Sequence, residues 1–99
     1  MSVLDEMLSL RQKFEDKDRQ DAIKVMTFLL HYEVSFRLGS EKTFTLFRNE
    51  NDLSAFCTNN EVKVPVMQQV IDEMRAEGLI APENMPVILT ELGVEKLCH

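Results

Sequence analysis

The chain has 99 residues and a mass of 11.5 kDa, the size of one domain with a single modest core. Apolar residues make up 44% and charged residues 28%, which excludes a wholly disordered chain. No apolar run approaches the roughly 18 residues of a membrane span, and the acidic start of the sequence lacks the basic region of a signal peptide. Two cysteines are too few for a disulfide scaffold, so we expect a cytoplasmic protein.

The net charge of −6 lies entirely in the second half of the chain. Residues 1–49 contain eight basic and eight acidic side chains, whereas residues 50–99 contain three basic and nine acidic ones. A half with this balance repels polyanions such as nucleic acids.

The first predicted helix covers about residues 3–15, with Ser2 as its N-cap. It carries a narrow apolar stripe at helical spacing, made of Leu4, Met7, Leu8 and Phe14. Such a stripe packs either at the edge of the chain's own core or against a second copy, as a dimerisation helix. We therefore divide the chain into an N-terminal helix, residues 1–17, and a domain over residues 18–99.

A second helix is predicted over about residues 19–32, with Asp18 as its N-cap and the broadest apolar face of the chain. Residues 34–47 allow two interpretations. Apolar and polar residues alternate on both sides of Gly39-Ser40, which favours a β-hairpin. Alternatively, the second helix continues through Phe36 and ends at Gly39. We favour the hairpin.

The second half begins with a short predicted helix over about residues 52–58. The next helix has Pro65 in its first turn and ends at Gly78. A short strand then starts at residues 79–80, a tight excursion follows over 81–86, and residues 87–89 return as a strand. Thr90 caps the last helix. The expected core contains Val25, Met26, Leu29, Leu53, Val70, Met74, Leu79, Ile80 and Leu89.

Two motifs in this half carry a family resemblance. The helix that ends in Glu77-Gly78-Leu79-Ile80 is followed, after the short excursion, by Leu89-Thr90-Glu91-Leu92-Gly93. Over about residues 50–97 this resembles the winged helix-turn-helix of bacterial regulators of the MarR and PadR types. The resemblance implies a mainly α (α+β) fold, with an extra N-terminal helix, a recognition helix that ends at Gly78 and a small β-wing over 81–86.

The same resemblance implies that the recognition helix and the wing contact the partner. Their candidate residues are Gln68, Gln69, Asp72, Glu73, Arg75, Glu83 and Met85. In DNA-binding members these elements need Lys or Arg, because phosphate contacts supply most of the affinity. Here the wing has no basic residue, and the helix exposes acidic ones. A basic strip from the first half, made of Arg11, Lys13, Lys17, Arg19 and Lys24, is the remaining route to DNA. The wing also offers an apolar contact point, made of Pro82, Met85 and Pro86.

The sequence predicts no enzyme site, cofactor or metal centre. His31, Cys57, Cys98 and His99 lack the usual spacing of zinc ligands, and Cys57 beside Phe56 is typical of a small buried apolar residue. We expect an acidic winged-helix module that binds a protein partner and no membrane. The alternatives are a dimeric DNA-binding transcriptional regulator and, as a minor one, a DNA-mimicking inhibitor.

Overall fold

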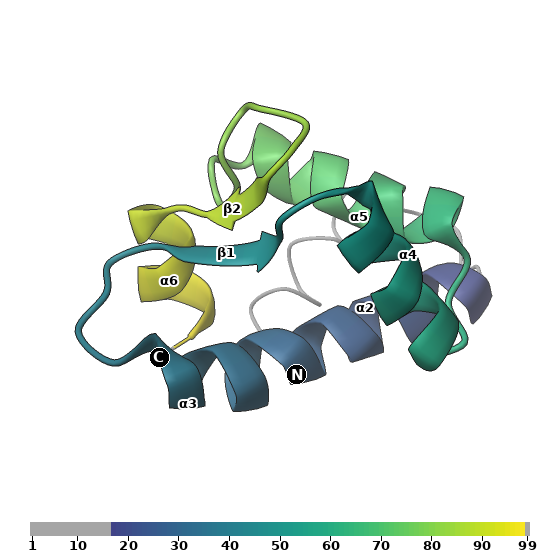
Figure 1. Ribbon diagram of the computed structural model, residues 1–99, viewed down its shortest axis with the longest axis horizontal. Helices are drawn as coiled ribbons and strands as arrows, with labels where there is room; N and C mark the ends of the chain where they lie inside the picture. The colour runs from purple at the N-terminus through teal and green to yellow at the C-terminus, as the bar shows by residue number, and fades with distance from the viewer. Residues whose placement is uncertain (1–16, 99) are drawn as a thin grey trace.

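The computed structural model describes residues 17–98, which form a mainly helical fold with one small antiparallel sheet (Figure 1). One continuous helical rod opens the described chain and consists of α2 (Lys17–Phe28), the wider π-helical turn η1 (Leu29–Val34) and α3 (Ser35–Leu38). The predicted helix over 3–15, its cap Ser2 and its stripe Leu4, Met7, Leu8 and Phe14 lie outside the described residues.

The hairpin predicted for residues 34–47 is wrong, and the alternative of a longer helix is confirmed. A strand would place Val34, Phe36 and Leu38 on one face. In the structure Val34 and Leu38 are buried, whereas the Phe36 side chain is 89% exposed, as a helix requires. The rod ends at Gly39, whose φ is +61°. The Ser35 hydroxyl adds a hydrogen bond to the carbonyl oxygen of Cys98 at 2.7 Å, which ties the rod to the end of the described chain.

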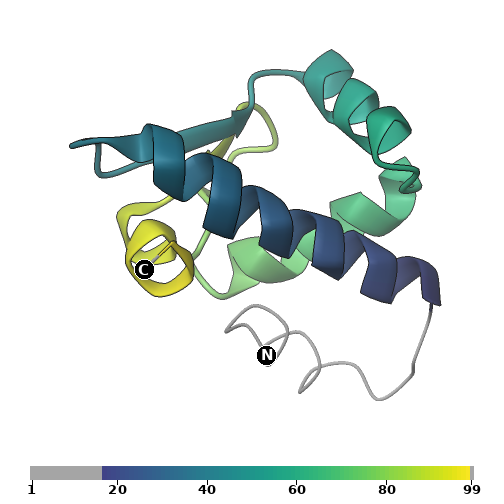
Figure 2. The ribbon, with the colours of Figure 1, turned by 90° about the horizontal axis from the view of Figure 1, so that it is seen from below.

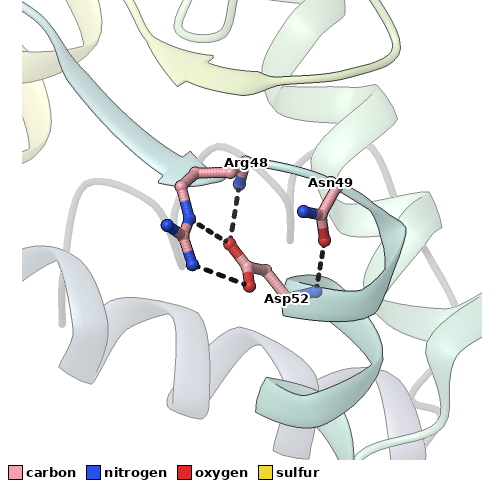
Figure 3. A network of polar contacts seen from close by, with 3 residues as sticks. All are labelled: Arg48, Asn49 and Asp52. Carbon is pink, nitrogen blue, oxygen red and sulfur yellow. Dashed lines mark hydrogen bonds and ion pairs between the residues drawn. The ribbon is translucent and has the colours of Figure 1, made fainter.

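The two helices of the second half are present as predicted. They are α4 (Glu50–Asn59) and α5 (Val64–Ala76), which begins with Pro65 in its first turn. The Asn49 side chain caps α4 by accepting a hydrogen bond from the Asp52 backbone N–H at 2.9 Å (Figure 3). After α5, Gly78 adopts a φ of +80°, the left-handed conformation expected of a residue that ends a helix. Helix α5 packs against α2, so these two helices form the centre of the fold.

The sheet joins segments that are far apart in the sequence. β1 (Phe44–Phe47) pairs antiparallel with β2 (Val87–Leu89), with Phe44 opposite Leu89 and an irregularity between Thr45 and Phe47. The predicted strand at residues 79–80 is reduced to a single bridge between Ile80 and Leu89. Figure 1 shows β1 and β2 side by side, with the loop over 81–86 projecting beyond them.

The last helix, α6 (Glu91–Leu97), starts where the sequence predicts. The Thr90 hydroxyl accepts a hydrogen bond from the Gly93 backbone N–H at 3.1 Å and caps the helix. The predicted cap at Asp18 is not formed as expected, because Asp18 lies inside the first turn of α2. None of the helices in the described range is long and apolar enough to cross a membrane.

The predicted core is confirmed at all but one position. Eight of its nine residues are buried, among them Leu79 with a side chain that is 1% exposed, and Val25 is partly buried at the edge. The sequence did not predict the burial of Arg19, which is 5% exposed. Among the described residues it is the single charged residue that is buried.

Candidate partner-binding surface

Helix α5 and the loop over 81–86 are held together by one side chain, Arg75. Its guanidinium donates hydrogen bonds to the carbonyl oxygens of Ala81 and Glu83, both at 3.0 Å. It also donates to the carboxylate of Asp72 at 2.8 Å, one turn earlier on α5. Only 15% of the Arg75 side chain is exposed. Arg75 therefore fixes the loop against the helix and is not free to contact a phosphate.

The outer face of α5 carries amide and carboxylate groups. Gln68 donates a hydrogen bond to Asp72 at 3.1 Å, and Gln69 is exposed. Asp72 thus accepts from Gln68 and from Arg75 while more than half of its side chain stays in solvent. This face presents one carboxylate and one unengaged amide.

The prediction that Glu73 lies on the outer face of α5 is wrong. Its carboxylate forms an ion pair with Arg19 on α2, and its side chain is 16% exposed. The helical period explains the difference, because Glu73 follows Val70 by three residues and so lies at the edge of the buried face of α5. The pair joins the two central helices and is part of the interior.

The loop over 81–86 is partly apolar and partly acidic. Pro82, Glu83 and Pro86 are exposed, whereas Met85 is half-buried and packs against the core. Beside Met85 lies an open hollow of about 370 Å³, whose other walls are Asn49, Glu50 and Asn51 at the start of α4. Glu50 belongs to this surface because of the β1–β2 pairing, which brings the start of α4 toward the loop. The sequence analysis did not predict it.

Most basic side chains of residues 17–98 lie within 4.0 Å of a carboxylate of the same chain, most of them at the exposed surface. Of the nine Lys and Arg residues between 17 and 98, seven form ion pairs with N–O distances of at most 4.0 Å. The pairs are Lys17–Asp21, Arg19–Glu73, Arg37–Glu33, Lys42–Glu91, Arg48–Asp52, Lys63–Asp18 and Arg75–Asp72. Within the described range this leaves Lys24 on α2 and Lys96 on α6, neither of which lies on α5 or the loop.

One of these pairs, Arg48–Asp52, is also held by a backbone hydrogen bond. Asp52 accepts hydrogen bonds from the Nε atom of Arg48 at 2.9 Å and from its backbone N–H at 3.1 Å (Figure 3). The side-chain hydrogen bond from Arg48 is the main cause that lowers the pKa of Asp52, and the backbone bond adds to it. At neutral pH this carboxylate is charged and its arginine is engaged.

The basic strip considered for the first half is broken up in the structure. Lys17 pairs with Asp21 at 2.8 Å, and Arg19 is buried. Of the described members only Lys24 is an exposed basic side chain without an ion pair, while Arg11 and Lys13 lie outside the described residues. A continuous basic face over α2 is therefore not formed by residues 17–98.

Three of the residues weighed for other chemistry, His31, Cys57 and Cys98, lie in the described part of the chain. Cys57 and Cys98 are buried free thiols, and burial raises the pKa of both. The Nε2 atom of His31 is buried without a hydrogen-bond partner among the described residues. In that part of the chain no group of three or more His, Cys, Asp or Glu side chains could hold a metal ion.

No protein-family model, curated protein or solved structure matches this chain.

Proposed function

We propose that residues 17–98 form a winged helix. The order of elements supports this: the long rod, β1, α4, α5, the bridge at Ile80, the projecting loop and β2. In this assignment α5 is the recognition helix and the loop over 81–86 is the wing. β1 pairs with β2, so the strand that follows the proposed wing is held in a small antiparallel sheet.

We further propose that the protein is an acidic interaction module that binds another protein. One observation carries this proposal, namely that seven of the nine described basic side chains are neutralised by carboxylates of the same chain. Most of these pairs are exposed and individually weak, but together they place a carboxylate beside each of seven basic groups, which reduces the positive charge available to a phosphate backbone. The exposed carboxylates Glu50 and Glu83, which have no ion pair in the described range, remain for a partner.

The partner that fits this surface is basic with an apolar residue at its centre. Met85 is the apolar residue of the hollow, and Glu50 on its wall and Glu83 on the loop supply negative charge nearby. Interfaces of this kind gain affinity from a buried apolar anchor, while the charges at the rim mainly speed association. Gln69 and Asp72 on α5 extend the same surface. The opposite charge is thus expected on the partner, as Lys or Arg around a Leu, Met or aromatic side chain.

The test is affinity capture from the native host's extract with two double variants of equal charge. Glu50→Lys/Glu83→Lys reverses the proposed surface, and Glu61→Lys/Glu95→Lys places the same charge on the α4–α5 turn and on α6. The proposal expects one protein that is captured by the wild type and by the control, and is lost with Glu50→Lys/Glu83→Lys and at high salt. Equal capture by both variants would contradict this placement of the surface.

The alternative, a DNA-binding regulator, predicts the opposite electrostatics. It requires that Arg75 leave the loop and that Lys63 leave Asp18, to which its ammonium donates at 2.9 Å. Retention of duplex DNA rather than a protein in the same capture would favour this alternative.

A further inference from the structure

The helical rod carries three exposed aromatic side chains outside the proposed partner-binding surface. Phe28, Tyr32 and Phe36 are spaced four residues apart, and their side chains are 56%, 66% and 89% exposed. The rings of Phe28 and Tyr32 stack with centroids 4.9 Å apart. We call these three residues the aromatic stripe. In Figure 2 the rod lies across the front of the other described elements, so one long side of it faces away from them.

A groove opens beside one end of this stripe. It has a volume of about 410 Å³ and lies between the rod and α4, with apolar walls from Val25, Phe28, Leu29 and Phe56. Its polar rim consists of Lys24, Glu33, Asn59 and Asn60. This volume is at the lower end of the range for ligand pockets, about 300–1,000 Å³, and has room for one aromatic side chain. Phe28 belongs both to the groove and to the stripe.

The groove and the most exposed ring are placed so that two copies complement each other. Phe36 lies eight residues from Phe28, about 12 Å along a helix. Two rods that run antiparallel about a twofold axis at Tyr32 bring Phe36 of each copy opposite Phe28 of the other, beside the groove. We propose that a second copy of this chain docks on the aromatic stripe in this way, with Phe36 of each copy in the groove of the other.

Charge complementarity supports this arrangement. In the antiparallel register, Lys24 of one copy approaches the end of α3 in the other. Glu41 lies there, two residues after Gly39. Both residues are exposed, and neither has an ion pair in the described part of the chain. At the observed exposures the stripe contributes roughly 400 Å² per copy, since a buried aromatic residue covers about 150–250 Å². A specific interface needs about 800 Å² per partner, so the groove walls and the flanks of the rod must supply the rest.

A helix formed by the N-terminal residues of the same chain would cover this surface less well. A helix over 3–15, as the sequence predicts, has 13 residues and extends about 20 Å. Folded back along the rod from Lys17, it would end near residue 31 and would leave Phe36 uncovered. A second copy therefore accounts for the most exposed ring, which a helix over 3–15 of the same chain would not reach.

The test is the mass of the full-length chain by sedimentation equilibrium from about 5 to 500 μM. The wild type is expected to approach twice 11.5 kDa. Tyr32→Glu and Tyr32→Lys should each be monomeric alone, because each places two like charges together on the twofold axis. An equimolar mixture of the two variants should regain the dimer mass. Phe36→Ser should weaken the dimer at least tenfold, and the matched control Leu92→Ser, at an exposed apolar residue on α6, should leave it unchanged.

Several results would overturn the proposal. A wild-type chain that stays monomeric at every concentration would do so, as would a mixture of the Tyr32 variants that does not associate. Circular dichroism at 222 nm checks that these surface variants remain folded. A dimer that survives both Tyr32 substitutions and is lost with Leu8→Glu would assign the contact to the N-terminal stripe instead.

Discussion

Gly93, in the first turn of α6, is the position where the fold leaves least room for a side chain. A Cβ atom there would lie 2.3 Å from the carbonyl oxygen of Leu79 and 2.6 Å from the Cδ1 atom of Leu89. Contacts of Cβ atoms below 3.0 Å essentially do not occur, so α6 would have to move by at least 0.7 Å. A leucine methyl group can rotate away, but the backbone oxygen cannot, because it accepts a hydrogen bond from the Thr90 N–H at 2.9 Å.

The expected cost of Gly93→Ala follows from three contributions. Overpacking of a core costs about 1–3 kcal/mol, and a clash with backbone belongs at the upper end. Weakening the hydrogen bond between Leu79 and Thr90 adds about 0.5–1.5 kcal/mol. The better helix propensity of alanine returns about 0.5–1 kcal/mol. The variant should therefore lose about 2–4 kcal/mol of unfolding free energy.

Urea unfolding followed by circular dichroism at 222 nm measures this loss. With a slope of about 1–3 kcal/mol/M, the unfolding midpoint should fall by about 1–4 M. The matched control is Glu95→Ala on the exposed side of the same helix, which should stay within about 0.5 kcal/mol of the wild type. If Gly93→Ala were as stable as the wild type, the close packing of α6 on the Leu79 backbone would be refuted.

Three further predictions use the same assay. Leu79→Ala removes a core side chain that is 1% exposed and should cost about 2–5 kcal/mol; a loss below 1 kcal/mol would contradict its burial. Glu73→Ala strands the buried guanidinium of Arg19 and should cost about 3–5 kcal/mol. The double variant Arg19→Met/Glu73→Ala should recover much of that loss, and strictly additive losses would argue against the pair. Because Arg48 lowers the pKa of Asp52 below its ordinary 3.8, the stabilising charge of Asp52 is present above about pH 4 and is lost as the pH falls through its folded pKa. The stability gap between the wild type and Asp52→Asn should therefore narrow below pH 4, and a gap that is constant with pH would contradict this.

The local signals in the second half of the sequence were sufficient to predict its helices. Pro65, Gly78 and Thr90 each mark a helix end by a hydrogen bond or a backbone conformation that depends on the residue itself. The segment 34–38 could not be decided in this way, because its alternating pattern also fits a helix whose exposed position is filled by Phe36. Tertiary packing of Val34 and Leu38 decided between the two.

The candidate surface was predictable only in part. Gln69, Asp72 and Glu83 are exposed as expected, but the pattern of α5 alone did not reveal that Glu73 meets Arg19 across 54 positions of sequence. Pairing of β1 with β2 likewise placed Glu50 beside the loop. The aromatic stripe does have a sequence signal, namely three aromatic residues at four-residue spacing, which the hairpin interpretation obscured.

Fluorescence anisotropy with a labelled DNA duplex, titrated with the full-length chain across a salt series, tests the central claim most directly. We propose that the basic side chains form ion pairs within the chain and that the exposed acidic surface binds a protein. If the protein is a protein-binding module, it should bind random duplex DNA no tighter than about 10⁻⁴ M at physiological salt, the weak end of ordinary non-specific affinity. This weak binding should depend little on the salt concentration. Micromolar affinity that falls steeply as the salt concentration rises would contradict the protein-binding proposal and would favour a DNA-binding regulator.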